Sequence, residues 1–334
     1  TVVNSILGPS FPYLASVGNH DVGSWNEGCT DTDGCYATFL KQRMTQIGIV
    51  PDDPNLNDQM YSVNFRGLKV VFVGQNGAST GDNTYAPYIQ NQLSNDNSIW
   101  KICSWHKNQN RMQVGGKSDE MGWRVYENCK DLGALIVTGH EHSYHRTKTL
   151  TSMQNQQVDT SQHPLVNGIP TNPNNLVVSP GKSFVSVSGL GGNSIRNQTR
   201  CLPLTYPYGG GTGCNYIWDK IYTSGQSAQY GVMFIEFYVD GNPNKARGYF
   251  KNTNGQIVDA FEITSIPEPQ TGPVCGNFIR EGNEQCDGPD LGGQTCQSLG
   301  YGGGTLSCTP SCTFDTSSCI TLSCEITTAS WSTS

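Results

Sequence analysis

The sequence is poor in charge of either sign and contains no long apolar run. Charged residues make up 14% of the 334 residues, and the formal net charge is −7 at pH 7. No basic stretch offsets this acidic balance, which argues against a nucleic-acid partner or an anionic membrane surface. No apolar run approaches the length that a membrane span requires. We therefore expect no membrane span and no nucleic-acid binding.

Cysteine, in contrast, is frequent, with 13 residues that are often close together in the sequence. This usage indicates disulfides formed in an oxidising compartment, and hence a protein that is secreted or at the cell surface. Two pairs that bracket short loops are expected to bond: Cys29 with Cys35, and Cys201 with Cys214. Cys103 and Cys129 are either bonded to each other or buried as thiols. The chain opens at Thr1 without a signal-peptide pattern, so we expect that any such segment was removed or lies upstream.

The composition changes near the C-terminus. Residues 1–265 are long enough to build a large core, and 266–274 form a stiff, proline-rich linker. Residues 275–324 contain seven cysteines and few large apolar side chains, which predicts a module held by disulfides, followed by a tail at 325–334. Zinc binding by Cys308 and Cys312 is the alternative, but no histidine lies nearby. Acidic residues at 281, 284, 287 and 290 could bind calcium, although a solvated face also explains them.

Histidine is scarce, and its positions are informative. Four of the six histidines follow strand-like runs: His20 after residues 13–17, His106 after 100–105, and His140 and His142 after 134–138. In an extended backbone His140 and His142 would point to the same side, because side chains alternate. Ligand sites of α/β sheets lie outside the carboxyl ends of strands, and neutral imidazole suits Zn, Fe, Mn or Co. The pattern predicts a metal site.

Three short motifs carry a resemblance to a known family. Gly18-Asn19-His20-Asp21, Trp105-His106 and Gly139-His140-Glu141-His142 occur in an order and at intervals that resemble the calcineurin-like metallophosphoesterase superfamily. The surrounding stretches 104–109, 112–117 and 138–147 resemble its secreted, purple-acid-phosphatase-like branch. The resemblance covers roughly residues 11–265. It implies an α/β fold of two sheets in an αββα sandwich, with the N-terminal part of the domain absent.

The resemblance also implies roles for individual residues. One metal ion would be held by Asn19, His106 and His140. His142 would bind a second ion, the pair being drawn from Zn, Fe or Mn. His20 would stay off the metals and act as an acid or an orienting group beside the leaving group, with Asp21 either orienting His20 or serving only as a turn residue. The implied function is a secreted phosphoesterase that hydrolyses small phosphate esters with a water activated by two metals.

The sequence departs from the family pattern upstream of these motifs. The family's D-x-H and G-D-x-x-D blocks, which supply further metal ligands, do not fit in residues 1–17, and Gly81-Asp82 is interpreted as a turn. Either these blocks lie upstream in a parent chain, or the protein binds metal poorly. The alternative function is therefore a catalytically impaired extracellular structural or adhesive protein that uses this fold as a scaffold. Its Cys-rich module would mediate self-association or contact with a cell surface.

Periodicity predicts the elements between the motifs. The sequence predicts a hairpin from 61–65 and 68–73, a helix within 85–97, a helix from Ser118 to Gly133, and second-sheet strands at 231–239, 246–250 and 257–263. Residues 151–181 are expected to be a long surface loop, and 189–192 a tight turn. His145 is interpreted as a hydrogen-bonded loop residue and His163 as a solvated one. Arg146 is either structural or in contact with phosphate.

Overall fold

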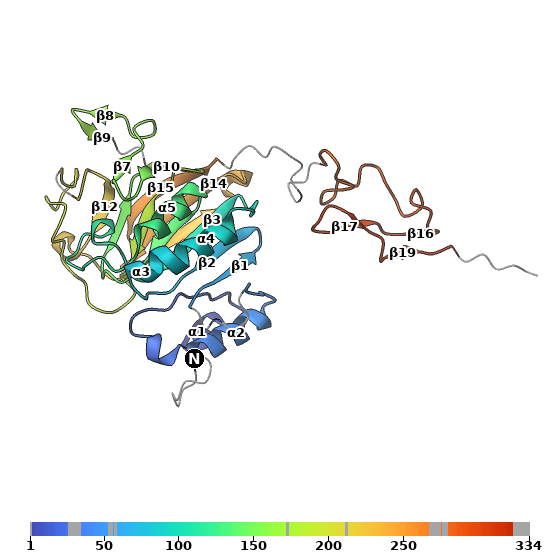
Figure 1. Cartoon of the computed structure of the whole chain (residues 1–334), viewed down its shortest axis with the longest axis horizontal. Helices are drawn as coiled ribbons and strands as arrows, with labels where there is room; N and C mark the ends of the chain where they lie inside the picture. Colours follow the sequence, from blue (N-terminus) through green and yellow to red (C-terminus); the bar gives the residue numbers. More distant parts are fainter. Residues whose placement is uncertain are drawn as a thin grey trace, which may run out of the picture. The chain divides into compact units, whose positions relative to one another are not determined.

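The structure is a computed structural model that describes residues 2–25, 35–52, 56, 59–171, 174–210, 213–266, 275 and 280–322. The chain separates into two compact units, Thr1–Glu268 and Pro269–Ser334, and each is described by itself (Figure 1). The elements of the larger unit are α1 (Val2–Leu7), η1 (Val22–Ser24), α2 (Tyr36–Gln46), β1 (Tyr61–Phe65), β2 (Leu68–Phe72), α3 (Ala78–Thr80), η2 (Gly81–Tyr85), α4 (Ala86–Leu93), β3 (Trp100–Trp105), η3 (Asn110–Met112), α5 (Trp123–Asp131), β4 (Leu135–Thr138), β5 (Tyr144–Thr147), β6 (Leu150–Ser152), β7 (Gln157–Val158), β8 (Leu165–Val166), β9 (Ile169–Pro170), β10 (Asn175–Val178), β11 (Val185–Ser188), β12 (Trp218–Tyr222), η4 (Ser224–Gln226), β13 (Gly231–Phe237), η5 (Val239–Gly241), β14 (Lys245–Asn252) and β15 (Ile257–Ser265).

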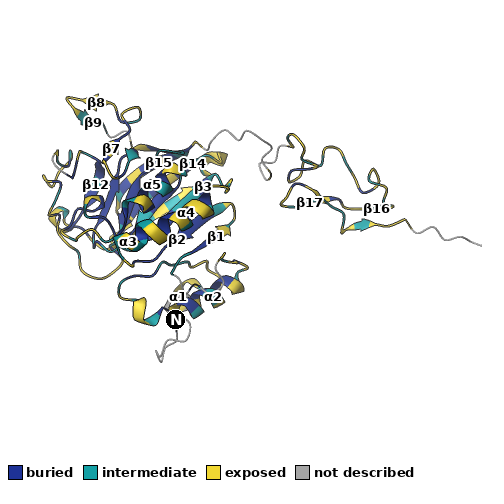
Figure 2. Cartoon of the chain, viewed as in Figure 1, coloured by how far each residue is buried: buried dark blue, intermediate teal, exposed yellow. Residues whose placement is uncertain are grey.

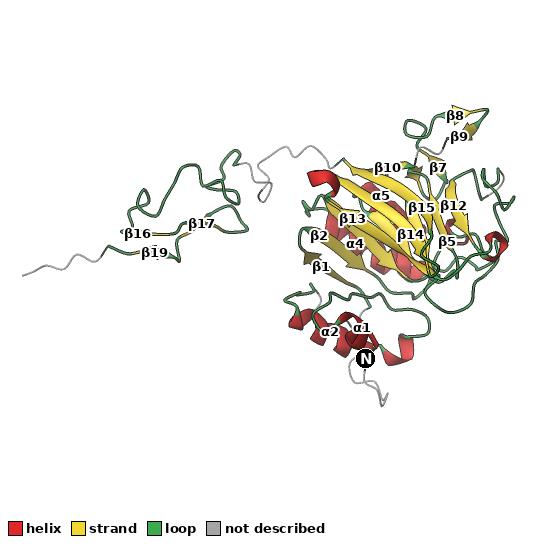
Figure 3. Ribbon diagram, turned by 180° about the vertical axis from the view of Figure 1, so that it is seen from behind, coloured by secondary structure: helices red, strands yellow, loops and turns green. Residues whose placement is uncertain are grey.

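Two sheets form the framework of this unit (Figure 3). The seven-stranded sheet has the order β1-β2-β3-β4-β11-β5-β12, and the four-stranded sheet has the order β10-β15-β14-β13. Strands β2, β3, β4 and β11 run parallel, so their carboxyl ends meet at one edge. A core that includes Trp100, Leu135, Phe184, Ala246 and Phe261 joins β3 and β4 to β14 and β15. The sequence prediction of a mixed α/β protein with a second sheet is thus confirmed.

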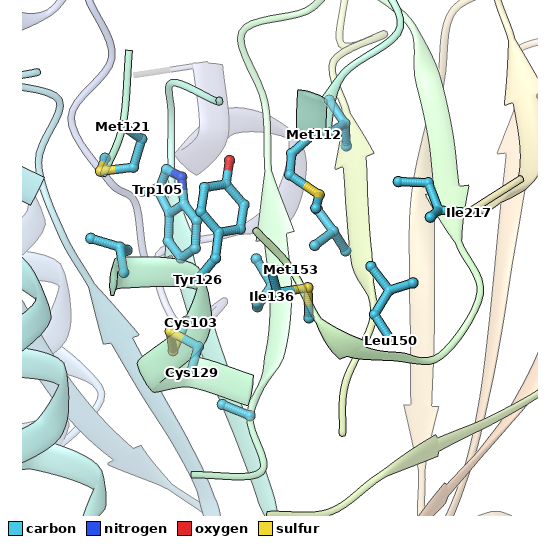
Figure 4. Close-up of a cluster of buried hydrophobic side chains, with 14 of the residues drawn as sticks. Cys103, Trp105, Met112, Met121, Tyr126, Cys129, Ile136, Leu150, Met153 and Ile217 are labelled. Carbon is cyan, nitrogen blue, oxygen red and sulfur yellow. A yellow bond between two sulfur atoms is a disulfide. The ribbon is translucent and has the colours of Figure 1, made fainter. Parts of the chain in front are cut away.

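Helices α4 and α5 cover the other face of the seven-stranded sheet. The strands beneath them are largely buried, whereas the outward residues of α4 are exposed (Figure 2). Trp105 and Tyr126 pack edge to face with ring centroids 4.8 Å apart, and the Cys103–Cys129 disulfide joins β3 to α5 (Figure 4). The two cysteines, for which the sequence left two alternatives, are therefore bonded.

The outer face of the four-stranded sheet is open to solvent. Val232 and Phe234 on β13 are 51% and 41% exposed, and Ile257 on β15 is 62% exposed. The expected outer helical layer of an αββα sandwich has no counterpart among the described residues. Helix α2 packs instead against β1 and β2, in a core that contains Tyr61 and Phe72.

The segment 13–17 was expected to be a strand but pairs with no strand among the described residues. Both the N–H and the C=O of Ala15 bond to the Tyr61 hydroxyl, at 3.1 and 2.7 Å. This side chain takes the place of a neighbouring strand, so the segment is extended without a ladder. Gly18 and the motif residues follow directly at its end.

Helix α5 begins at Trp123 and not, as expected, at Ser118. The preceding segment is held by the loop after β3, because Glu120 N–H donates to the Asn108 carbonyl at 3.0 Å. The helix start is capped by Asp82, whose carboxylate accepts from Arg124 N–H at 2.8 Å. Asp82 lies in the π-helical segment η2 and not in a turn. The expected stop at Gly133 is confirmed by its φ of +68°.

Residues 151–181 are less irregular than expected. They contain the short strands β7, β8 and β9, and β10 pairs in parallel with β15. His163 is fully buried, since its Nε2 accepts from Thr149 N–H at 3.0 Å and its Nδ1 lies 3.0 Å from the Thr171 carbonyl. The prediction of a solvated His163 was wrong. The hairpin of β1 and β2 and the strands β13, β14 and β15 agree with the sequence prediction.

A buried ionic network on β5 links the two sheets. The guanidinium of Arg146 donates to Asp259 on β15 at 2.8 and 3.1 Å and to Asp219 on β12 at 3.0 Å. Lys148 also pairs with Asp219, at 3.0 Å. Arg146 is therefore structural, the first of the two alternatives. His145, which precedes Arg146, lies in the strand and not in a loop; it is buried, with its Nδ1 3.1 Å from the Ser143 hydroxyl.

The smaller unit is held by disulfides. Its described residues contain four two-residue strands: β16 (Gly303–Gly304), β17 (Ser307–Cys308), β18 (Phe314–Asp315) and β19 (Cys319–Ile320). Three disulfides connect Cys275 to Cys312, Cys286 to Cys308 and Cys296 to Cys319. The disulfide prediction is confirmed for these cysteines, and the zinc alternative is wrong because Cys308 and Cys312 each bond elsewhere.

The expected Cys201–Cys214 bond is present in the larger unit. The expected partner of Cys35, Cys29, lies outside the described residues, as does Cys324. Within the described part of the chain, every helix is too short or too polar to cross a membrane.

Candidate metal centre

Three segments meet at the carboxyl edge of the parallel strands. His106 directly follows β3, and the motif that contains His140 directly follows β4. Strands β3 and β4 pair in parallel, with Trp105 opposite Thr138, so both histidines emerge at the same edge. Asn19 reaches them from the loop after residues 13–17.

The polar atoms of these side chains face one another. Asn19 Oδ1 lies 2.8 Å from His106 Nε2, which lies 3.0 Å from His140 Nδ1. The two rings pack edge to face with centroids 4.7 Å apart. An amide oxygen and two imidazole nitrogens form a donor set that suits a divalent transition metal. The residues present therefore fit one metal ion.

The backbone at His140 adopts the left-handed region, with a φ of +67°. Few non-glycine residues do so, and the conformation persists only where the surroundings impose it. Asn108 donates to the Gly139 carbonyl at 2.8 Å, and the Lys117 ammonium donates to the His140 carbonyl. The backbone is thus bent at His140, so the extended segment from which a common side was predicted for His140 and His142 is not present.

His142 is held by the loop that follows β11. Its Nδ1 lies 2.8 Å from the Ser194 hydroxyl, and its carbonyl accepts from Arg196 N–H at 2.9 Å. The loop begins at Gly189, where an added Cβ would lie 1.9 Å from the Glu141 carbonyl oxygen. The glycine at this position allows the loop to approach the histidine motif.

Glu120 is a site residue that the sequence analysis missed. Its Oε2 lies 3.0 Å from His140 Nε2, and its Oε1 lies 3.2 Å from the Lys107 ammonium. The sequence pattern assigned Glu120 to the first turn of a helix. No sequence signal connects it to His140, because the contact depends on how the loop after β3 folds back.

The site lowers the basicity of its histidines. Burial first, and then the positive charge of Lys117, lower the pKa of His106 to about 4 and that of His140 to about 3. Burial also lowers the pKa of Lys117 to about 8, and it raises the pKa of the Glu141 carboxyl. Both imidazoles are therefore neutral at pH 7, as metal ligands must be.

The loop of Asn19 also carries His20 and Asp21. His20 is exposed, and Asp21 accepts from Gly18 N–H at 2.9 Å, which closes the turn. Burial, followed by the charges of Arg196, Lys117 and His20, lowers the pKa of His142. An orientation of His20 by Asp21 stays a prediction.

No family model matches the sequence, and no curated protein matches it. Among solved structures, a chain described as "Structure of PhoD" matches with a TM-score of 0.36 and 10% sequence identity. The match covers 76% of this chain and 52% of that chain, so the present chain spans about half the length of that structure. A likeness of this size carries no argument, and the function must be inferred from the site.

Proposed function

We propose that this protein is a secreted, metal-dependent phosphoesterase that hydrolyses small phosphate esters. One metal ion would be held by Asn19, His106 and His140, and His142 would contribute to a second. The observation that carries the proposal is the convergence of Asn19 Oδ1, His106 Nε2 and His140 Nδ1 in successive steps of 2.8 and 3.0 Å at one sheet edge. The disulfides of both units support an oxidising compartment.

The charges around the centre suit an anionic substrate. Lys107, Lys117 and Arg196 all act on His140, and Glu120 and Glu141 are the acidic groups near them. Glu120 is paired with Lys107, and the buried Glu141 lies 3.7 Å from Arg196, whose side chain is 43% exposed. The three cations outnumber these two carboxylates, and this excess of positive charge would attract a phosphate group.

The chemistry would divide between the metal and the protein. Bound metal ions would supply Lewis acidity toward water and the phosphoryl oxygens. His20 is exposed beside Asn19 and would give a proton to the leaving oxygen, the role of a general acid. Asp21 keeps the loop of Asn19 and His20 closed through its bond to Gly18.

The proposal is tested by metal analysis together with hydrolysis of p-nitrophenyl phosphate. Purified protein should contain Zn, Fe or Mn and turn over the ester, and His140→Ala should lose both while its circular dichroism spectrum is unchanged. Asn19→Ala should weaken metal retention. Its matched control is Asn83→Ala, because Asn83 lies in η2 and its side chain donates to the Ser79 hydroxyl at 3.3 Å, in the adjoining α3. Equal metal content and turnover in His140→Ala and the unaltered protein would overturn the proposal.

One observation favours a second candidate, an extracellular scaffold without catalysis. Among the described residues, one group of three acidic, histidine or cysteine side chains lies close enough together to hold a metal ion: Glu284, Asp287 and Cys312, in the smaller unit. Cys312 is already bonded to Cys275. No carboxylate of the described chain joins the three donor atoms at the sheet edge. A folded protein that neither retains metal nor hydrolyses the ester would support the scaffold, with the Cys-rich module as its site of self-association or cell-surface contact.

A further inference from the structure

Glu120 connects the candidate metal centre to a lysine outside it. Its two carboxylate oxygens have separate partners, His140 Nε2 at 3.0 Å and Lys107 Nζ at 3.2 Å. The side chain of His140 is 11% exposed and that of Glu120 is 22% exposed. Solvent therefore competes weakly for the contact between the carboxylate and the ring.

This contact determines which ring nitrogen carries the proton. An ionised carboxylate only accepts hydrogen bonds, so His140 Nε2 must be protonated to bond to Glu120. In a neutral ring, Nδ1 then keeps its lone pair. The Nδ1 lone pair faces His106 Nε2 at a distance of 3.0 Å. It therefore points toward the other atoms that we propose as metal ligands.

The main chain fixes the distance between the two partners. The buried side chain of Asn108 donates to the Gly139 carbonyl at 2.8 Å, and the main-chain carbonyl of Asn108 accepts from Glu120 N–H at 3.0 Å. The Tyr126 hydroxyl donates to Asn108 Oδ1 at 3.1 Å. Asn108 thus ties the backbone of Glu120 to the backbone next to His140. The pair is a built contact and not a chance ion pair between mobile surface side chains.

We propose that Glu120 is a positioning residue that holds His140 in the Nε2–H tautomer and presents its Nδ1 as a ligand to a divalent metal. Lys107 holds the second carboxylate oxygen and keeps the first directed at the ring. Carboxylates that bond the far nitrogen of a ligating histidine fix its tautomer and raise its basicity toward metal. The metal part of this inference rests on the proposed function, whereas the tautomer is a property of the protein without metal.

The tautomer is measured by nitrogen NMR of the histidine-labelled, metal-free protein. His140 should show a protonated Nε2 and an unprotonated Nδ1. Glu120→Ala should redistribute the proton between the two nitrogens, whereas Glu120→Gln, whose amide oxygen still accepts, should largely preserve the pattern. A protonated Nδ1 in the unaltered protein, or an unchanged His140 spectrum in Glu120→Ala, would overturn the inference.

The metal affinity is measured on the full chain by titration with Zn²⁺ against a chelating dye. Glu120→Ala should weaken binding by about 10- to 100-fold, the usual cost of losing such a partner, and Glu120→Gln should weaken it less. Asp119→Asn is the matched control, since the Asp119 carboxylate accepts from Asn110 N–H at 2.9 Å and bonds to no histidine of the described residues. Its affinity should be unchanged.

The two proposals fail in different ways. If His140→Ala binds Zn²⁺ as tightly as the unaltered protein, the proposed metal centre is wrong. If binding requires His140 but Glu120→Ala retains full affinity, the metal centre stands and the role of Glu120 is refuted.

Discussion

Replacing Asp259 with alanine tests the buried network that joins the two sheets. The change removes three hydrogen bonds, two from Arg146 at 2.8 and 3.1 Å and one from the Tyr144 hydroxyl at 2.7 Å. It also changes the network of Arg146, Lys148, Asp219 and Asp259 from two charges of each sign to two cations and one anion. Arg146 has no route to solvent, because its side chain is 0% exposed.

The charge on Arg146 will persist after the substitution. Burial alone would lower the pKa of Arg146, but Asp259 and Asp219 together raise it above its ordinary value. Even without these partners, a guanidinium does not lose its proton near neutral pH. Breaking a buried pair by removing one partner costs about 3–5 kcal/mol. The lost Tyr144 bond adds about 1 kcal/mol, so we expect a loss near the upper end of this range.

The assay is denaturant unfolding followed by tryptophan fluorescence, with Glu262→Ala as the control. Glu262 pairs with Lys245 at 3.3 Å on the exposed face of the same strand, β15. Exposed pairs contribute about 0–1 kcal/mol. A variant in which Arg146 and Asp259 are both replaced by apolar residues should recover most of the lost stability, since no charge is left buried. A loss below about 1 kcal/mol for Asp259→Ala would refute the reasoning.

The remaining predictions concern His145 and Gly189. Burial lowers the pKa of His145 from 6.5 to about 3, so its stabilising contribution is complete above pH 6.5 and is lost as the pH falls toward 3. His106 and His140, whose pKa values are also lowered, act in the same direction, so the test is the difference between the two proteins. At pH 5 the loss of unfolding free energy should be about 2 kcal/mol smaller in His145→Gln than in the unaltered protein, in denaturant titrations at several pH values. In Gly189→Ala the new Cβ would lie 1.9 Å from the Glu141 carbonyl oxygen, so thermal unfolding should report a loss of about 1–3 kcal/mol together with weaker Zn²⁺ binding. Gly191→Ala, where a Cβ meets nothing within 4 Å, should behave like the unaltered protein, and equal losses in both variants would contradict the argument.

The sequence predicted the elements whose apolar patterns are local. The apolar run before Gly139 and the run before His106 were correctly interpreted as strands, and they became the parallel neighbours β4 and β3. Parallel pairing then brings the residues after each strand to one edge. The meeting of His106 and His140 therefore followed from local patterns together with one general rule of sheet topology.

The parts that the sequence did not predict depend on polar contacts between distant segments. Ser118 and the acidic residues after it have the composition of a helix start, yet Glu120 is bound to Asn108 and His140 instead. His163 lies in a polar stretch but is buried by bonds to Thr149 and Thr171. Such contacts have no periodicity, so propensity alone assigned these residues to the solvent or to a helix.

The local construction of the histidine motif bears on the choice between an enzyme and a scaffold. His140 occupies the left-handed region at a φ of +67°, and the loop at Gly189 approaches so closely that no side chain fits. Such backbone strain costs on the order of 1–3 kcal/mol for a residue and persists only where the surroundings impose it. A scaffold would gain stability from an unstrained turn and an apolar contact here. The bend at His140 accompanies the 3.0 Å approach of its Nδ1 to His106 Nε2, an approach that the proposed metal centre would use and that a scaffold would not need.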